Sequence, residues 1–243
     1  MRDERTTPDA TGDGLPSWGT ALVVVAHPDD ESFGLGAILS TLVARGTAVD
    51  VLCLTRGEAS TLHGVEGDLS EIREHELRAA ADALGARDVT LRDLPDGGLA
   101  GVSEEVLDGE VDRAVAASRP DGIVTLDTTG ISGHPDHIAA TLAAVRVAAR
   151  HGLGVLAWTV PEELCATLAD EGHAGFVGRP AAEIDLTLRV DRTAQRAAVD
   201  CHPSQAVPGS VLWRSSCLAR WMRYWVRYTM GEQPNSDWKA RYR

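Results

Sequence analysis

Short apolar runs alternate with segments of helical periodicity along most of this chain, and this alternation constrains the fold more than any other feature. Thr20–Ala26 is a continuous apolar run, which is typical of a strand buried on both faces of a parallel sheet. Ser32–Arg45 follows with apolar residues at helical spacing and stops at Gly46, a residue typical of helix ends. The alternation predicts an α/β fold, with a mostly parallel sheet and helices on both faces.

The rest of the chain continues this pattern without an internal repeat or a clear domain boundary. Further strands are expected at 49–54, 89–94, 122–126, 155–160 and 184–190, and further helices at 69–84, 104–118, 135–151, from 161 onward, at 191–203 and at 211–229. We expect a single domain over residues 19–230, preceded by a flexible polar tail (1–18) and followed by a C-terminal tail (231–243).

Composition narrows the classes of function. The 243 residues carry a formal net charge of −13, which disfavours binding to nucleic-acid phosphates or to an anionic membrane surface. No apolar run reaches the roughly 18 residues of a membrane span, and the N-terminus lacks the basic-then-apolar order of a secretory signal. The four cysteines form no C-x-x-C pair. We therefore expect a cytoplasmic protein that acts on a small molecule, and the sequence leaves homo-oligomer formation open.

Two motifs rich in histidine and carboxylate side chains directly follow expected strands. HPDDE occupies residues 27–31 after the first strand, and HPDH occupies residues 134–137 after the fourth. Because the carboxyl ends of parallel strands meet at one edge of the sheet, we expect the two motifs to lie together. His27 and Asp30 are one helical turn apart, and with His137 they offer two imidazoles and a carboxylate, which is typical of an open catalytic zinc site. Ferrous iron accepts the same ligands, so the choice of metal stays open.

The other polar residues of the two motifs suit hydrolysis. Water bound to zinc can lose a proton near neutral pH, and Asp29 is the candidate base that accepts it. His134 is the candidate for stabilising the oxyanion and for donating a proton to the leaving nitrogen. Asp136 could accept a hydrogen bond from His134 and fix its tautomer. Either motif alone is also typical of a helix N-terminus, but their pairing at strand ends favours a metal site.

Gly34 and Gly36, after the first strand, raise the alternative of a dinucleotide-binding site. Position 39 is leucine where that fingerprint needs glycine. Carboxylates also occupy the strand-to-helix turn, where they would repel a pyrophosphate. The sequence therefore disfavours a nicotinamide enzyme.

Six short motifs, in chain order, resemble those of one known family. They are AHPDDE (26–31), TRGE (55–58), R-x-x-E-L-x-x-A (73–80), LPDG (94–97), GHPDH (133–137) and HPSQ (202–205). Together they resemble the PIG-L/LmbE family of zinc-dependent N-deacetylases over residues 20–205. The resemblance implies a Rossmann-like fold and hydrolysis of an N-acetyl group on a glucosamine-type substrate.

The resemblance also implies roles for individual residues. The implied roles are metal ligands at His27, Asp30 and His137, a base at Asp29, an acid or electrostatic histidine at His134 with its partner Asp136, and substrate contacts from Arg73 and Asp96. From the residues alone, Arg73 could equally form a weak surface ion pair with Glu76, and Asp96 is a natural turn residue. His202 is a further substrate-binding candidate that could instead cap a helix end.

Two positions depart from the family pattern and leave the substrate open. Ser132 stands where some members carry a tyrosine, and Gln195 stands where a basic residue is common. We expect a zinc-dependent hydrolase that removes an N-acetyl group from a glucosamine-type sugar or its conjugate. The alternatives are an amidase that cleaves a larger amide of a sugar–thiol conjugate, and a non-catalytic, metal-dependent sugar-binding module.

Overall fold

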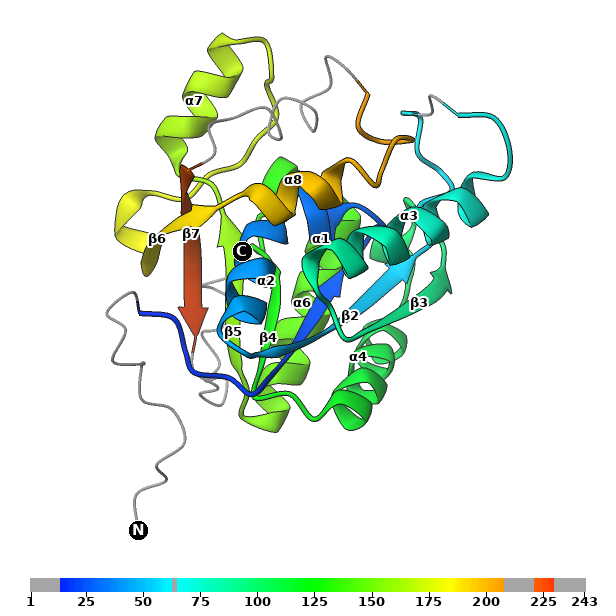
Figure 1. The fold of residues 1–243 in the computed structure, drawn as a ribbon, viewed down its shortest axis with the longest axis horizontal. Coiled ribbons are helices and arrows are strands. Elements are labelled where there is room, and N and C mark those ends of the chain that lie inside the picture. Colours follow the sequence, from blue (N-terminus) through cyan, green and yellow to red (C-terminus); the bar gives the residue numbers. More distant parts are fainter. Residues whose placement is uncertain (1–13, 63–64, 208–220, 230–243) are drawn as a thin grey trace.

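A sheet of seven strands runs through the molecule, and helices cover both of its faces (Figure 1). The computed structural model describes residues 14–62, 65–207 and 221–229. The strands are β1 (Thr20–Val25), β2 (Ala48–Thr55), β3 (Asp88–Leu94), β4 (Gly122–Leu126), β5 (Gly154–Thr159), β6 (Leu186–Asp191) and β7 (Trp221–Thr229). The helices are α1 (Asp30–Phe33), α2 (Gly36–Ala44), α3 (Leu69–Leu84), α4 (Glu104–Ser118), α5 (Gly130–Gly133), α6 (Pro135–His151), α7 (Glu162–Asp170) and α8 (Thr193–Val199), with short 3-10 turns η1 (Leu99–Gly101) and η2 (Ala181–Glu183).

The strand order is β3-β2-β1-β4-β5-β7-β6. The first five strands of this order are parallel, whereas β7 pairs antiparallel with both β5 and β6. Because β2 and β3 lie on one side of β1 and β4 and β5 lie on the other, the strand order reverses between β1 and β4. Rossmann-like folds bind ligands at the carboxyl ends of the strands beside such a switch point. The predicted fold class is confirmed.

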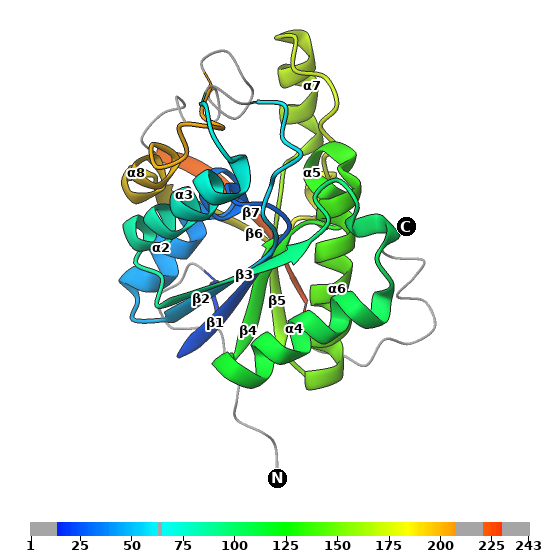
Figure 2. The same ribbon diagram turned by 90° about the vertical axis from the view of Figure 1, so that its right-hand side faces the viewer.

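Strand β1 shows how the sheet divides the core into two layers. Its side chains alternate between the faces: Val23 packs in a cluster with α2, α3 and α8, whereas Leu22 and Val24 pack in a cluster with α4 and α6. Figure 2 shows α2, α3 and α8 on one side of the sheet and α4 and α6 on the other. Since both faces are covered, the strand is apolar and buried from Ala21 to Val25.

Several expected elements have the boundaries that the sequence predicts. Helices 69–84 and 135–151 and strand 122–126 begin and end at the expected residues. The Asp68 side chain caps α3 by accepting a backbone N–H of its first turn, and Gly85 ends the helix with φ 80°, a conformation that glycine adopts without steric cost. Among the described helices, none combines the length and the apolar character that crossing a bilayer requires.

The helix expected over residues 32–45 is interrupted, since α1 ends at Phe33 and α2 begins at Gly36. The side-chain amide of Gln195, on α8, donates hydrogen bonds to the carbonyl oxygens of Ser32 (2.9 Å) and Phe33 (3.0 Å). It thereby satisfies acceptors that a continuous helix would bond internally. A Cβ on Gly36 would come within 2.8 Å of Gln195 Cγ, so the small residue permits this approach. A contact from a distant segment sets the break, and local periodicity does not reveal it.

The prediction for the C-terminal segment is wrong in part. Residues 221–229, expected within a helix, form β7 between β5 and β6, and α8 ends at Val199 rather than at residue 203. The sequence of β7 is rich in aromatic and β-branched residues, which favour strands. Positions 211–220 of the expected helix and the expected tail over 231–243 lie outside the described residues.

The tail expected over residues 1–18 does not extend to residue 18. Leu15 is 0% exposed and Trp18 is 5% exposed, and both belong to the core. Gly122, the first residue of β4, leaves space for the indole, because a Cβ there would collide with the ring of Trp18. Residues 1–13 lie outside the described residues.

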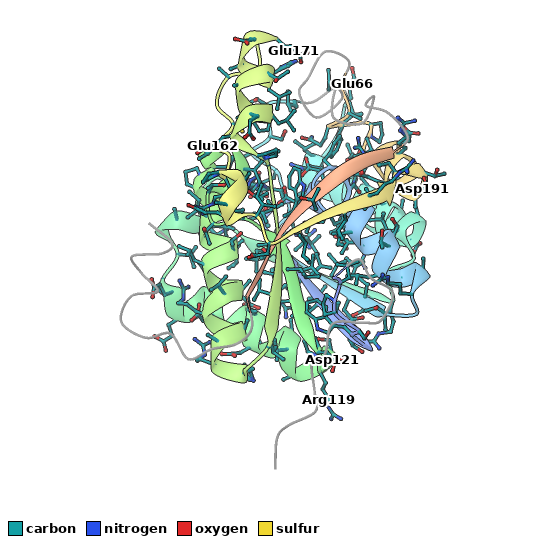
Figure 3. The ribbon with its side chains drawn as sticks, turned by 90° about the vertical axis from the view of Figure 1, so that its left-hand side faces the viewer. Glu66, Arg119, Asp121, Glu162, Glu171 and Asp191 are labelled. Atoms are coloured by element: carbon teal, nitrogen blue, oxygen red, sulfur yellow. The ribbon has the colours of Figure 1, made fainter. Side chains whose placement is uncertain are left out.

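The two ends of the parallel strands face opposite ends of the molecule. Figure 3 shows Asp121, directly before β4, at one end, and Glu66, in the loop after β2, and Glu171, directly after α7, toward the other. The second end is that of the strand carboxyl termini. The HPDDE motif follows β1 there, and the HPDH motif follows β4 and α5, so the sheet places both motifs at the edge that the sequence predicts.

Replacement of Trp18 by alanine is expected to lower the free energy of unfolding by about 3–5 kcal/mol, because it leaves a cavity at a buried site. The matched control is Val106→Ala, at a residue that is 45% exposed, which should change the free energy of unfolding by less than about 0.5 kcal/mol. Urea unfolding followed by circular dichroism measures both values. Similar small effects in the two variants would contradict the place of Trp18 in the core.

Candidate functional site

The two histidine-containing motifs meet beside the switch point between β1 and β4. Residues 27–31 lead from β1 into α1, and residues 134–137 lead from α5 into α6. The ring centroids of His27, His134 and His137 lie between 4.7 and 5.1 Å apart. The parallel sheet therefore brings together residues that are far apart in the sequence, as the motifs predict.

Three atoms of metal-ligand type converge within this cluster. His27 Nδ1 lies 3.1 Å from His137 Nε2, which in turn lies 3.1 Å from Asp30 Oδ1. The backbone orients the Asp30 carboxylate, since its Oδ2 accepts the N–H groups of Ala26 (3.2 Å) and His27 (3.0 Å). The exposed fractions of the three side chains lie between 9% and 16%. The ligand atoms lie within 4.8 Å of one another, so the three residues could hold one metal ion.

Hydrogen bonds on the far side of each ring determine which nitrogens carry hydrogen. His137 Nδ1 lies 3.1 Å from Gly130 O, which only accepts, so Nδ1 is the donor. His27 Nε2 lies 3.0 Å from Asp96 Oδ1 and 3.2 Å from Asp136 Oδ2, so Nε2 donates there. In the neutral rings, the lone pairs of His27 Nδ1 and His137 Nε2 then face each other, which is unfavourable unless a cation or a proton lies between them. Histidine metal ligands are typically oriented in this way through their second nitrogen.

The charge around the cluster also favours a cation. Four carboxylates interact with it, those of Asp29, Asp30, Asp96 and Asp136. Burial alone would lower the pKa of His27, but the hydrogen bonds with Asp136 and Asp96 raise it to about 10. The cluster therefore stabilises positive charge. Two imidazoles and a carboxylate form the kind of donor set that a divalent transition metal prefers.

Asp136 pairs with His27 rather than with His134, which differs from the expectation. Its Oδ2 accepts hydrogen bonds from His27 Nε2 and from the N–H of Gly97 (2.7 Å), and its Oδ1 accepts from the N–H of Leu99 (3.0 Å). The bond between the two motif residues runs instead from the backbone N–H of Asp136 to Nδ1 of His134 (3.2 Å). The loop after β3 supplies the donors that orient the carboxylate, and the spacing of the HPDH motif does not reveal that loop.

His134 caps α6 and keeps one donor nitrogen for a ligand. Because its Nδ1 accepts a backbone N–H, the neutral ring carries its hydrogen on Nε2. Burial lowers the pKa of His134, and the charges of His137 and His27 lower it further. His134 is only partly buried, and the neighbouring Ser132 is exposed. The ring is thus suited to donate a hydrogen bond as a neutral group.

Asp29 lies at a strained turn between β1 and α1. Its φ of 140° falls in a region that side chains rarely adopt, at a cost of about 1–3 kcal/mol. Its Oδ2 lies 3.0 Å from Arg73 Nη2. Burial raises the pKa of Asp29 to about 6, although the charge of Arg73 opposes that rise. A carboxylate whose pKa lies near neutrality suits proton transfer.

Arg73 is a buried residue, and its guanidinium contacts the turn that carries Asp29. It is 2% exposed, and its guanidinium donates hydrogen bonds to the carbonyl oxygens of Gly57 (2.7 Å) and Pro28. A Cβ on Gly57 would collide with the guanidinium, so this glycine leaves the space that Arg73 fills. These contacts differ from the expected surface ion pair with Glu76, because the buried side chain orients the backbone beside Asp29. The substrate contact that the resemblance implies stays a prediction.

Asp96 and His202, the other two residues expected at the substrate, also have protein partners. Asp96 lies against the outer nitrogen of His27. His202 is fully buried, with Nε2 2.7 Å from Glu31 Oε1 and Nδ1 3.8 Å from Glu76 Oε2. Burial would lower the pKa of His202, but the two glutamates raise it to about 9. The placement of His202 does not support a substrate contact, because the ring lies inside a buried ion network.

The sequence reasoning missed Glu31 and Glu76. Glu31 is fully buried and accepts the backbone N–H of Asp29 (2.9 Å). Glu76 accepts the backbone N–H (2.9 Å) and the hydroxyl (2.6 Å) of Ser204. The sequence does contain a signal for both, because each glutamate belongs to a motif that also contains expected site residues, HPDDE for Glu31 and R-x-x-E for Glu76.

The chain matches a known protein family over a region that includes the same two motifs. The family model described as GlcNAc-PI de-N-acetylase (PIG-L) matches residues 22–148, which include the HPDDE and HPDH motifs. The chain belongs to the PIG-L family. One relative of this PIG-L protein is the 1D-myo-inositol 2-acetamido-2-deoxy-alpha-D-glucopyranoside deacetylase of Kineococcus radiotolerans. It is 30% identical over 246 residues, which cover 76% of this chain and 68% of that protein. Among relatives with that name, the matched share of their own length ranges from 51% to 85%.

Solved structures share the fold. The N,N'-diacetylchitobiose deacetylase of Pyrococcus horikoshii has a TM-score of 0.62 and 21% identity, with 88% of this PIG-L chain and 85% of that chain covered. The 4-carboxy-2-hydroxymuconate hydratase of Pseudomonas putida KT2440 has a TM-score of 0.65 and 19% identity, with 89% and 98% covered. These likenesses show the fold alone, and the fold carries a hydratase as well as a deacetylase.

The converging donors predict a stoichiometric metal site. We expect the purified protein to retain about one equivalent of divalent metal, as in catalytic sites with three protein ligands. Asp30→Asn and His137→Gln should each remove most of it, because each takes away one donor. His151→Asn is the control, since that ring is exposed and pairs with Asp112. Plasma mass spectrometry after dialysis measures metal per chain, and full retention in both ligand variants would contradict the assignment.

Proposed function

We propose that this PIG-L family member is a zinc-dependent hydrolase that removes the N-acetyl group from a glucosamine-type sugar or its conjugate. The observation that carries the proposal is the convergence of His27 Nδ1, Asp30 Oδ1 and His137 Nε2, with Asp29 and His134 beside them. The names of the Kineococcus relative and the Pyrococcus structure both specify an N-acetylated sugar, which supports the same class of substrate.

Zinc fits the donor set, and three protein ligands leave a coordination position for water. When bound there, zinc supplies a Lewis acid that polarises the acyl carbonyl and lowers the pKa of the attacking water. Ferrous iron accepts the same donors, so metal content is measured together with activity. The cytoplasmic location stays a prediction from the sequence, which leaves homo-oligomer formation open.

Asp29 accepts the proton of the attacking water in this proposal. Its Oδ2 is paired with Arg73, and among the described residues its Oδ1 has no hydrogen-bond partner, so Oδ1 is the accepting atom. Because burial raises the pKa of Asp29 to about 6, the carboxylate is more basic than an exposed aspartate and is still ionised at neutral pH.

His134 stabilises the negative charge that develops on the acyl oxygen. Its Nδ1 accepts the N–H of Asp136, so Nε2–H is the group that donates to the oxyanion. A neutral ring cannot readily give up that hydrogen, and the proton that Asp29 has taken from water therefore passes to the leaving nitrogen. The C–N bond then breaks, and the products are acetate and a free amine.

A substrate panel tests this function directly. N-acetylglucosamine, its inositol glycoside and diacetylchitobiose are each incubated with zinc-loaded protein, and acetate and free amine are measured in parallel with larger N-acyl analogues. We expect equimolar acetate and amine from at least one acetylated sugar. Cleavage of larger amides alone would favour the amidase, and binding without cleavage would favour the sugar-binding module; either result contradicts the proposal.

Replacement of Asp29 by asparagine should lower kcat/KM by about 10²–10⁴-fold, the usual contribution of a general base, while metal content is retained. The change removes the proton acceptor but keeps the size of the side chain. Asp112→Asn is the matched control, because that carboxylate pairs with Arg150 and His151 at the surface. Activity in Asp29→Asn equal to that of the parent would exclude this residue as the base.

A further inference from the structure

We infer that Glu31, held in place by His202, is a positioning residue for Asp29. The inference rests on the proposed function, because it assigns these buried groups the task of fixing the orientation of the base. Neither side chain faces solvent, since both are 0% exposed. They act on Asp29 through hydrogen bonds that the structure describes one by one.

The peptide unit between Pro28 and Asp29 is held at both ends. Its N–H donates to Glu31 Oε2 at 2.9 Å, and its carbonyl oxygen accepts from Arg73 Nη2. These two groups lie on opposite sides of one planar unit. Glu31 and Arg73 together therefore fix the rotation of that plane, and this rotation sets the φ angle of Asp29.

That φ angle, 140°, is unfavourable for an aspartate, so surrounding contacts must maintain it. On the helix side, the Asp29 carbonyl accepts the N–H of Phe33 at 2.8 Å, so the following turn is also fixed. Loss of the bond to Glu31 would let the preceding peptide rotate toward a relaxed conformation. The Asp29 carboxylate would then shift relative to Asp30, which directly follows it and belongs to the ligand cluster.

Glu31 is itself oriented from a distant part of the chain. Its Oε1 accepts hydrogen bonds from His202 Nε2 (2.7 Å) and Ser32 Oγ (2.6 Å). The other side of the His202 ring faces Glu76 on α3, at 3.8 Å, and Ser204 bonds both oxygens of that glutamate. The segment after α8 thus connects α3 to the turn that carries Asp29.

His202 also compensates the charge of Glu31. A buried glutamate beside the Asp29 and Asp30 carboxylates would be repelled by them. An imidazole between Glu31 and Glu76 offers a hydrogen on each nitrogen and balances negative charge. Without it, Glu31 would lose the donor that orients it and turn away, and the Asp29 N–H would lose its acceptor.

The inference is tested with two replacements of one residue. His202→Leu removes the donor to Glu31, whereas His202→Gln keeps an N–H donor at a similar reach. We expect His202→Leu to lower kcat by about 10–100-fold, the cost of a small misplacement of a catalytic group, with KM and metal content close to those of the parent. His202→Gln should recover most of kcat. Should His202→Leu fail to fold, Glu31→Gln provides the test, because its amide NH2 must face either the Asp29 N–H or the donors His202 Nε2 and Ser32 Oγ.

Amide hydrogen exchange provides a readout that does not depend on activity. In the parent, the Asp29 N–H is bonded to a fully buried carboxylate, so NMR should find it protected from exchange. The protection should fall in His202→Leu and persist in His202→Gln. Thr47→Val is the control for loss of a buried hydrogen bond, since Thr47 Oγ1 donates to Trp18 O (2.9 Å). It should lower stability and leave both kcat and the exchange of Asp29 unchanged.

The outcomes separate the inference from the proposed function. Faster exchange at Asp29 together with a lower kcat in His202→Leu supports the inference. Unchanged exchange, an unchanged kcat despite faster exchange, or an equal loss of kcat in Thr47→Val overturns it. Parent protein that releases no acetate from any sugar would count against the proposed function alone, because the exchange rates still decide whether Glu31 and His202 hold the Asp29 peptide.

Discussion

The rest of the site depends on two imidazole nitrogens and a carboxylate oxygen that face one another across the switch point of the sheet. His27 Nδ1, His137 Nε2 and Asp30 Oδ1 are all acceptors when the rings are neutral, and they lie 3.1 Å apart along the chain of contacts. Such a group is stable only with positive charge among its members. The hydrogen bonds that His27 Nε2 donates to Asp96 and Asp136 maintain this arrangement, so the arrangement of polar groups in the site favours a cation.

Backbone strain and buried charge at the site both lower the stability of the folded state. The contacts and the apolar packing around the site compensate for this loss. Asp29 has a strained backbone. Two charged side chains that contact Asp29, those of Glu31 and Arg73, are buried. Buried charges are tolerated where each finds partners, and here the partners come from α3 and from the segment after α8. Two apolar layers, one on each face of the sheet, supply the burial that compensates for this strain. The turn that carries Asp29 is thereby held by Arg73 on α3 and, through Glu31, by His202 in the segment after α8.

The sequence predicts the fold class and the cluster of metal-ligand residues because both depend on local sequence patterns. Apolar runs identify β1 and β4, and the motifs that follow them must meet once the strands are parallel. What it does not predict depends on contacts between distant segments. Gln195 breaks the expected helix at Phe33, the Asp136 carboxylate turns to His27 instead of His134, and His202 is enclosed by glutamates rather than open to a sugar. The assignment of residues 221–229 to a helix failed because aromatic side chains at helical spacing also suit a strand.

The most direct test of the central claim is anomalous diffraction at the zinc absorption edge from crystals of the metal-loaded protein. We predict one strong peak about 2.0–2.2 Å from His27 Nδ1, His137 Nε2 and an oxygen of Asp30, the usual distances for zinc ligands. His27 Nε2 should still be bonded to Asp96 and Asp136. A protein that holds zinc with the peak on other residues, or with any of these three too far away to coordinate, would contradict the account.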